Sequence, residues 1–238
     1  MNINFAWPHN RLLRALPLET LERLIPELET IECRREQILM DAESPIDAVY
    51  FPESGVISVV AVYADGSIVE MATIGREGST GVQAFFGVTH SSIRFLVQIP
   101  GKVVKMSRAT FDHAMKTMPP FRALMSSYAH ALLEQVLVSG ACNAAHSLSK
   151  RLARWLLMMR DRSDADVLPV TQNLLAEMLG VQRPTVTLAI QVLEQAGLIL
   201  RGRKAVTIVN RAGLIDAACE CYSLVRARLA FHLPKTYA

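Results

Sequence analysis

Side chains of types that can hydrogen-bond to flat polar ligands such as nucleic-acid bases gather in one short stretch of this chain. The outward positions of a helix-like run, and the residues just ahead of it, carry donors, acceptors and one apolar group: Gln182, Arg183, Thr185, Thr187, Leu188 and Gln191. An arginine can bind a guanine bidentately, and a threonine can meet a phosphate or the methyl group of a thymine. The spacing therefore predicts a helix that lies in the major groove with its amino-terminal residues at base edges.

A short helix, a tight turn and a longer helix must hold these side chains. Thr171 can cap the first helix, because its hydroxyl can accept from the unpaired amides of the first turn. Leu175, Ala176 and Leu179 recur at helical spacing, and the small Ala176 permits a second helix to cross closely. Gly180 can take a positive φ at the end of this helix without a Cβ penalty. The pattern predicts the first half of a helix-turn-helix.

The second helix follows at once. Pro184 occupies the place of a first helical residue, where the amide has no intrahelical partner and proline is tolerated. Val186, Ile190 and Leu193 form its buried stripe, and Gly197 closes it. We expect one face of this helix in the core and the opposite face on DNA.

A basic hairpin completes the motif. Arg201, Arg203 and Lys204 cluster within residues 198–208, where a wing would meet phosphates. A helical hairpin packed inside an enzyme is the alternative, in which Arg183 is an ordinary solvated charge. The hairpin favours a winged helix-turn-helix that binds double-stranded DNA, because its cations lie where phosphates would be.

The charge of the chain is unevenly divided. The 238 residues carry a net charge of +3, but residues 147–238 hold 13 Lys/Arg against 7 Asp/Glu, whereas residues 1–146 hold 12 against 15. A basic carboxyl-terminal part and a slightly acidic amino-terminal part indicate that one end binds nucleic acid and the other has a different task. The length permits one large domain or two modest ones.

The composition argues against several classes of protein. No run of about 18 uncharged apolar residues is present, so we expect no transmembrane helix and no membrane partner. Residues 1–8 lack the basic start and long apolar core of a signal peptide, and we expect a cytoplasmic protein. An enzyme would need a convergent acid/base or metal set, and we expect no catalytic residue, because the β-rich part has no His/Glu cluster at ligand spacing.

The cysteines are scattered, which argues against a disulfide framework. They are Cys33, Cys142, Cys219 and Cys221. Cys219 and Cys221 are close in sequence, but residues two apart on a helix do not share a face, and no second ligand pair is evident. We therefore expect buried or incidental thiols and no metal site, with a metal or redox site as the alternative.

The amino-terminal half combines a short helix with strands. Residues 11–29 carry leucines at helical spacing, interrupted by prolines. Asp65-Gly66 lies between two β-branched runs and is the strongest hairpin signal. From about residue 31 to 107, short β-like runs alternate with turn signals: 48–51, 55–63, 67–74, 94–99 and 102–107. These runs predict an antiparallel sandwich or barrel.

Helices dominate the rest of the chain. Residues 121–146 form a long helix that is too apolar to stand alone in water, so it packs on its own domain or, as we favour, on a second copy of the chain. Another helix is expected over residues 147–162. Its cations are expected to face largely outward: Lys150, Arg151, Arg154 and Arg160. A last helix runs from about residue 211 to 231.

The predicted fold class is α+β. A helix and a jelly-roll-like antiparallel β-roll occupy residues 1–112 as a sensor domain, and a connecting dimerisation helix occupies residues 113–146. The winged helix-turn-helix occupies residues 147–238.

This order of parts resembles the Crp/Fnr family of bacterial transcription regulators over essentially the whole chain. The residues that carry the resemblance lie in the predicted helix-turn-helix and at the entry to the roll: Ala176, Gly180, Arg183, Thr185, Val186, Leu193, Gly197-Leu-Ile199, Tyr50-Phe51 and Gly55-Val-Ile57. The resemblance implies a homodimer that binds a palindromic promoter site and recruits or blocks RNA polymerase. It also implies that an effector in the roll biases the orientation of the DNA-reading parts.

The recognition helix departs from the family's pattern after Arg183. The family often has a glutamate next and a second arginine four residues later, where this chain has Pro184 and Leu188. The operator sequence of the better-known members is therefore not transferred to this chain.

The roll departs from the family's cyclic-nucleotide-binding members. Those carry a glutamate that meets the ribose and an arginine that holds the cyclic phosphate, but here Val82 and Ser91 stand in their places. A phosphate in a roll needs such a cation, and Arg94 lies on the opposite strand face by parity, with Arg76 a further candidate. The candidate pocket residues are a degenerate set: Gly81, Val82, Gln83, Ser91 and Ser92. We expect no ordinary cyclic-nucleotide binding.

No cofactor is identified from the sequence. Iron–sulfur sensing in the family needs clustered cysteines near the amino terminus, where this chain has Cys33 alone. Heme needs His or Cys ligands, and His90 and His113 lie singly in or beside the roll. Two alternatives stay open: a cyclic-nucleotide-responsive regulator with a divergent pocket, and an adaptor whose winged helix binds another protein.

Overall fold

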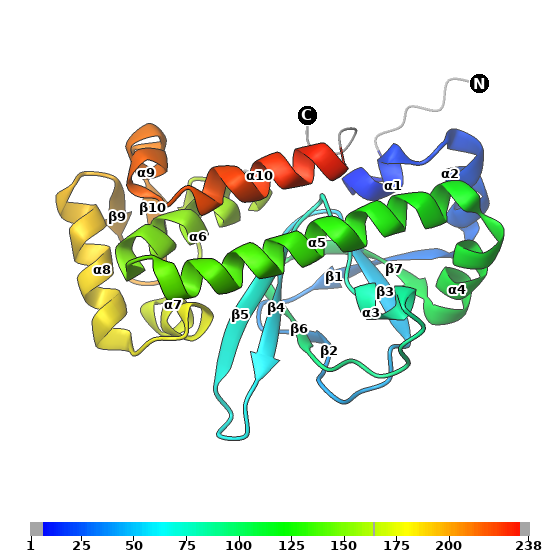
Figure 1. The fold of residues 1–238 in the computed structure, drawn as a ribbon, viewed down its shortest axis with the longest axis horizontal. Coiled ribbons are helices and arrows are strands. Elements are labelled where there is room, and N and C mark those ends of the chain that lie inside the picture. The colour runs from blue at the N-terminus through cyan, green and yellow to red at the C-terminus, as the bar shows by residue number, and fades with distance from the viewer. Residues whose placement is uncertain (1–6, 164, 234–238) are drawn as a thin grey trace.

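The chain folds into an amino-terminal β-roll, a long central helix and a carboxyl-terminal helical part (Figure 1). The structure, a computed structural model, describes residues 7–163 and 165–233. The predicted α+β class is confirmed. Within the described ranges, no helix combines the length and the apolar character that crossing a membrane requires.

Short helices cover one end of the roll. α1 (Arg11–Ala15) begins after Asn10, whose side chain accepts hydrogen bonds from two amides of the first turn. α2 (Leu18–Leu24) continues into a single 3₁₀ turn, η1 (Ile25–Glu27). The helix expected over residues 11–29 is thus broken into short pieces, because proline lacks the amide hydrogen of a continuous helical ladder.

Two antiparallel sheets form the β-roll. The strand order is β1–β7–β3 in one sheet and β2–β6–β4–β5 in the other. The strands are β1 (Leu28–Cys33), β2 (Ile38–Met40), β3 (Ala48–Pro52), β4 (Val56–Val62), β5 (Ile68–Ile74), β6 (Arg94–Ile99) and β7 (Gly101–Ser107). Val49, Phe51, Phe95 and Val104 fill the space between the sheets and are fully buried. The strand runs predicted from the sequence are confirmed.

The β4–β5 hairpin projects from the roll and ends in the predicted Asp-Gly turn (Figure 1). The Asp65 carboxylate accepts a hydrogen bond of 2.9 Å from the Ser67 amide, and Gly66 has a φ of +83°. Glycine takes this conformation without steric cost, which explains its place in the turn.

A long helix joins the two ends of the molecule. α3 (Val82–Phe85) and α4 (Arg108–Thr117) flank the roll, and α5 (Pro119–Ala145) runs along the whole structure (Figure 1). The Tyr128 hydroxyl on α5 donates a 2.7 Å hydrogen bond to the Ser79 carbonyl. A Cβ at Gly78 would lie 2.6 Å from the same hydroxyl oxygen, so the glycine permits this close approach, and its amide also closes a turn by donating to the Gly75 carbonyl at 3.1 Å.

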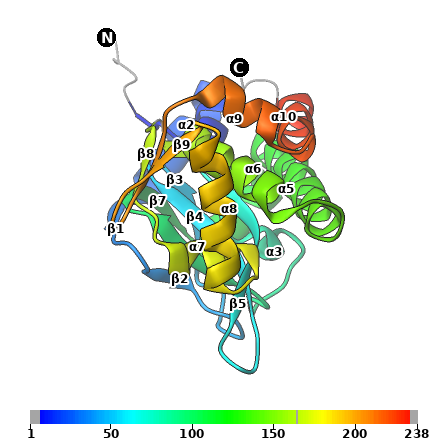
Figure 2. The same cartoon turned by 90° about the vertical axis from the view of Figure 1, so that its left-hand side faces the viewer.

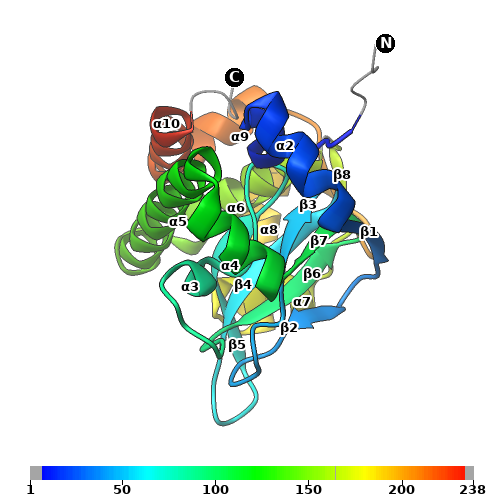
Figure 3. The same ribbon diagram turned by 90° about the vertical axis from the view of Figure 1, so that its right-hand side faces the viewer.

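The carboxyl-terminal part packs helices around a small sheet of strand order β8–β10–β9. Its elements are α6 (Leu148–Ser163), β8 (Val167–Leu168), α7 (Gln172–Leu179), α8 (Arg183–Gln195), β9 (Ile199–Arg201), β10 (Val206–Ile208), α9 (Arg211–Ala217) and α10 (Cys221–His232). α10 returns along α5 (Figures 1 and 3), and His232 Nε2 on α10 lies 2.8 Å from Glu134 Oε2 on α5.

The expectation that the cations of α6 face outward is wrong for two of them. Lys150 is exposed and Arg160 is half-buried, but Arg151 and Arg154 are 9% and 6% exposed. α6 is enclosed by neighbouring helices and β5, and Arg151 Nη2 donates to the Leu179 carbonyl at the end of α7 at 2.6 Å. This contact satisfies a carbonyl that has no partner within α7. Helical periodicity cannot reveal it, because the carbonyl is 28 residues further along the chain.

Candidate nucleic-acid interface

The helix-turn-helix forms as the local sequence predicts. The Thr171 hydroxyl accepts from the Leu174 amide at 3.2 Å and caps α7. Gly180 has a φ of +63° and ends that helix. α8 begins one residue before the expected Pro184, which therefore occupies its second position. The predicted stripes of both helices are buried: Leu175, Ala176, Leu179, Val186, Ile190 and Leu193.

The opposite face of α8 is open to solvent (Figure 2). Five of the predicted reading residues are exposed along it: Gln182, Arg183, Thr185, Leu188 and Gln191. Leu188 is 62% exposed, and Val192, one turn further along, is 53% exposed. Val192 was missed in the sequence prediction, although its spacing of four from Leu188 is the signal that would have found it. Exposed apolar groups on this face suit contacts with thymine methyl groups.

Thr187 differs from the expectation for a reading residue. It is half-buried, and its Oγ1 lies 3.0 Å from Gln172 Oε1 on α7 and 3.1 Å from the Arg183 carbonyl. The hydroxyl therefore has one acceptor on α7 and one on its own helix. Helical spacing places Thr187 near the edge of the outward face, and the polar partner on α7 turns it inward.

The wing carries its cations at the tip. The Gly202 amide donates to the Ala205 carbonyl at 2.8 Å and closes the turn between β9 and β10. Arg203 and Lys204 are exposed at this turn. Arg201 is held at its base, where its Nη2 lies 3.8 Å from Glu194 Oε2 on α8.

A cleft of about 210 Å³ lies between the wing and the start of α8. Arg183, Arg201 and Arg203 line it together with Gln172 and Asn173 of α7. The structure thus brings three sequence-predicted cations to one surface, where phosphates would be attracted. Gln172 and Asn173 were not singled out from the sequence, because nothing local distinguishes them from other polar residues in a first helical turn.

The β-roll reaches the turn of the helix-turn-helix directly. A second cleft, of about 630 Å³, is bordered by the β4–β5 hairpin, by Arg94 and by the residues around Gly180 and Arg183. A Cβ at Gly180 would lie 3.3 Å from two methyl carbons of Val69, so the turn and β5 are in contact. The amino-terminal end of the reading helix is therefore positioned by the roll as well as by its own domain.

Buried polar groups fasten α6 to the roll and to α5. Trp155 Nε1 donates to Glu70 Oε2 at 3.0 Å, and the Ser58 hydroxyl donates to the same oxygen at 3.1 Å. Burial raises the pKa of Glu70 to about 7, although hydrogen bonds from Trp155 and Ser58 act in the opposite direction. Close by, Arg162 Nε on α6 lies 2.7 Å from Glu77 Oε1. No sequence pattern predicted these pairs, which join positions 85 residues apart.

The roll contains an apolar cavity of about 660 Å³ between α3, β4, β5 and α5. Val82, Gln83 and Phe86 form one wall, and Leu133 and Val136 of α5 form another. Among the described lining residues there is no lysine or arginine of the kind that holds a cyclic phosphate, and His130 is the one side chain there that can carry a positive charge.

The polar side chains among the remaining candidate pocket residues form hydrogen bonds with one another. The Ser91 hydroxyl donates to Gln83 Oε1 or to the Ile93 carbonyl, at 2.8 and 2.7 Å, and Gln83 Nε2 donates to Ser92 Oγ at 2.8 Å. Gly81, with a φ of +70°, forms the turn into α3.

The predicted cation candidates lie elsewhere. Arg94 faces away from the apolar cavity, as parity predicted, and its Nε lies 2.7 Å from Asp41 Oδ1. The hydrogen bond from Arg94 is the main cause of a lowered pKa at Asp41. Arg76 lies beside α1, where its carbonyl accepts from the Arg11 amide at 2.6 Å.

The statement that Cys219 and Cys221 lack a second ligand pair is wrong. Cys142 and His146, at the end of α5, lie against them, and the four ligand atoms are within 4.8 Å of one another. Cys33 is buried in the roll. The sequence argument failed because Cys219 precedes α10, which begins at Cys221, so the rule for two positions on one helix does not apply.

Known domain families match both halves of the chain. The cyclic nucleotide-binding domain matches residues 30–118, and the Crp-like helix-turn-helix domain matches residues 150–217. No curated relative matches the chain significantly.

Solved structures share the fold over about 80% of this chain. FixK2 from Bradyrhizobium japonicum is 16% identical with a TM-score of 0.69, over 81% of this chain and 98% of that one. The c-di-GMP-responsive global regulator CLP of Xanthomonas campestris is 16% identical with a TM-score of 0.68, over 81% and 99%. A transcriptional regulator from Thermus thermophilus is 21% identical with a TM-score of 0.67, over 80% and 98%. At these identities the likeness shows the fold.

Proposed function

We propose that this chain, which belongs to the Crp/Fnr family of transcription regulators, binds a promoter sequence as a homodimer and reads it through α8. The supporting observation is the exposed face of α8 together with the cations that share a cleft beside it. In this proposal Arg183 reads a guanine, while Arg203 and Lys204 bind phosphates of the flanking backbone. Gln182, Thr185, Leu188 and Gln191 complete the reading surface, and Arg201 supports the wing.

The dimer is proposed on the open face of α5. Leu133 and Leu137 are 53% and 62% exposed, and they are one helical turn apart on the same side of α5. Gly140 continues this side, and open space lies where its Cβ would be. A second copy of the chain would bury this apolar row, which is costly to leave in water. A two-fold pair would also place two copies of α8 about one turn of DNA apart.

The proposed role of the roll is to hold the reading domain in a particular orientation. The Glu70–Trp155 and Glu77–Arg162 contacts link β5 and the adjoining loop to α6. The apolar cavity borders the same α5 face that we assign to the dimer, so a molecule in the cavity would act on helix pairing. We propose that this effector is not a cyclic nucleotide held in the usual way, because its phosphate would face apolar walls.

Footprinting of the purified full chain on DNA upstream of its own gene tests the proposal. We expect a protected pseudo-palindrome with half-sites roughly 10 base pairs apart, and an affinity that falls steeply as salt rises. RNA polymerase would then be recruited or blocked at that site. The absence of any protected sequence, together with retained binding to another protein, would support the adaptor alternative instead.

A further inference from the structure

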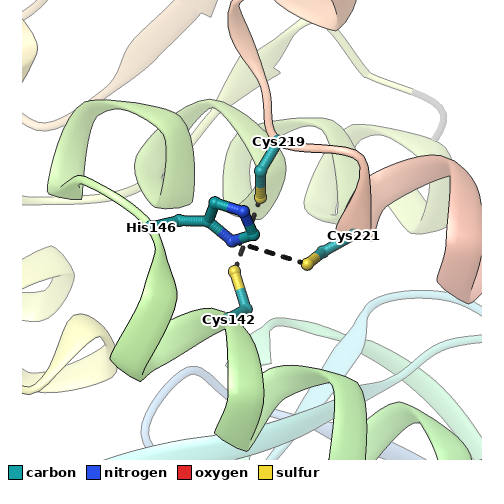
Figure 4. A group of neighbouring side chains, drawn as sticks. All are labelled: Cys142, His146, Cys219 and Cys221. Carbon is teal, nitrogen blue, oxygen red and sulfur yellow. Dashed lines mark hydrogen bonds between the residues drawn. The ribbon is translucent and has the colours of Figure 1, made fainter.

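Four potential metal ligands converge where the central helix meets the DNA-reading part (Figure 4). Cys142 and His146 come from the last turn of α5 and its carboxyl-terminal cap. Cys219 comes from the segment that joins α9 to α10, and Cys221 is the first residue of α10. The three thiols and the imidazole point toward one another from two separate segments of the chain (Figure 4).

The separations match a tetrahedral ion. The Sγ atoms of Cys142 and Cys219 are 3.4 Å apart, and Cys221 Sγ is 3.7 Å from His146 Nδ1. Zinc–sulfur bonds of about 2.3 Å and zinc–nitrogen bonds of about 2.0–2.1 Å, at tetrahedral angles, place sulfurs about 3.8 Å apart and sulfur and nitrogen about 3.5 Å apart. The pocket therefore needs only small side-chain movements to enclose one ion.

The orientation of His146 suits a ligand. Its Nε2 lies 3.2 Å from Glu220 Oε1, while its Nδ1 faces the thiols. A hydrogen bond from Nε2 to the carboxylate leaves the Nδ1 lone pair free to bind a metal. Metal-binding histidines commonly have such a carboxylate partner, which fixes the tautomer and the direction of the ring.

The surroundings suit a closed structural site. Cys142, Cys219 and Cys221 are 0%, 2% and 6% exposed, and the His146 side chain is 16% exposed. Four protein ligands leave no open position for water or substrate, which is the pattern of structural rather than catalytic zinc. Thiolates and imidazole together select zinc over magnesium or calcium, which prefer oxygen ligands.

The backbone explains how these residues reach one point. Cys142 and His146 are four positions apart at the end of a helix and so share a face. Cys219 lies in the linker and Cys221 is the first residue of α10, so the two side chains converge although they are two positions apart. The two pairs are 77 residues apart in sequence and meet because α10 packs along α5.

We propose that Cys142, His146, Cys219 and Cys221 bind one structural Zn²⁺ ion that fastens α10 to the end of α5. His146 lies two residues before the start of α6, the helix that carries the Trp155 and Arg162 contacts to the roll and to α5. The ion would therefore set the junction between the dimer helix and the DNA-reading domain. The metal site does not depend on the proposed operator. A chain that binds no metal would therefore leave the DNA-binding proposal intact.

Metal analysis of the full-length chain, purified under reducing conditions, tests this assignment. We expect about one zinc per chain by mass spectrometry of the metal. After exchange, Co²⁺ should give the absorption bands of a tetrahedral, thiolate-bound ion. Cys142→Ser and Cys219→Ser should lose the metal, whereas Cys33→Ser, which alters a buried thiol in the roll, should retain it. Glu220→Gln should weaken metal affinity by about 10- to 100-fold, because it removes the charged partner of His146.

Two outcomes for the wild-type chain would overturn the proposal. One is a folded, reduced wild-type chain that takes up neither Zn²⁺ nor Co²⁺, a measurement that does not depend on any variant folding. The other is a Cys142–Cys219 disulfide recovered from cells whose thiols were trapped at lysis, which would assign the pair to a covalent link. Retention of one metal by a Cys142→Ser/Cys219→Ser double variant would likewise exclude this ligand set.

Discussion

Trp155 on α6 and Glu70 on β5 form a buried hydrogen bond of 3.0 Å between the DNA-reading part and the roll. Both side chains are almost wholly removed from solvent, and Trp155 connects α6 to that strand. A change in the charge of the Glu70 carboxylate therefore alters the contact between the roll and the DNA-reading part.

The stability of this boundary should depend on pH. The folded-state pKa of Glu70, about 7, lies above its ordinary value of 4.5, so burial favours the protonated form. Its contribution to stability is fully present below about pH 4.5 and is lost as pH rises through 7. Between pH 5 and 8 the wild type should lose on the order of 2–3 kcal/mol relative to Glu70→Gln. Urea unfolding across this range measures the difference, and Glu22→Gln on the exposed side of α2 is the matched control. Parallel pH profiles for wild type and Glu70→Gln would contradict the prediction.

Arg183→Ala should weaken specific DNA binding by about 1–3 kcal/mol and relax the preference at one base pair. The reason is that, in the proposed complex, this exposed arginine at the start of α8 makes a bidentate contact with a guanine. Titrations against the operator and its single-base variants measure both effects. Arg203→Ala serves as the comparison, since a phosphate contact should weaken all sequences alike and reduce the salt slope by about one. If Arg183→Ala weakened binding to all sequences equally, Arg183 would be a phosphate contact instead of a base contact.

Replacing Leu133 and Leu137 by glutamate should convert a dimer into monomers. Both side chains are exposed on one side of α5, and charges there would repel across a two-fold interface. Sedimentation should show the change in mass, and operator affinity should fall toward the non-specific level, a loss of about 10³-fold or more. Leu18→Glu, at a leucine of α2 that is 50% exposed, should change neither the mass nor the operator affinity. A double variant that stays dimeric would place the interface elsewhere.

Cyclic AMP and cyclic GMP should not raise the melting temperature of the protein. The cavity walls are largely apolar, and the hydroxyl of Ser91, where the sequence comparison expects the phosphate-binding position, is hydrogen-bonded to Gln83 or Ile93. A ligand at 100 times its dissociation constant would add about 2.7 kcal/mol to the free energy of unfolding, which a melting curve readily detects. A saturable rise with either nucleotide would instead support a divergent cyclic-nucleotide pocket.

Local sequence determined those parts of the protein whose caps, turns and apolar spacings can be recognised within a few neighbouring residues. The cap at Thr171, the turn at Gly180 and the stripe from Val186 to Leu193 are short-range patterns, and each is present in the structure. The Asp65-Gly66 turn and the strands around it follow from equally local preferences. For this reason the fold class and the reading helix could be predicted before any tertiary contact was known.

Tertiary structure alone decided where several polar side chains point. Thr187 turns to Gln172, and Arg151 turns to the end of α7, because a polar group removed from water must find a partner and the nearest one lies on another helix. Cys142 and Cys219 meet across 77 residues for a related reason, since packing α10 along α5 brings them together. Sequence spacing describes neighbours on one element, whereas a site assembled from two elements exists only once they are packed.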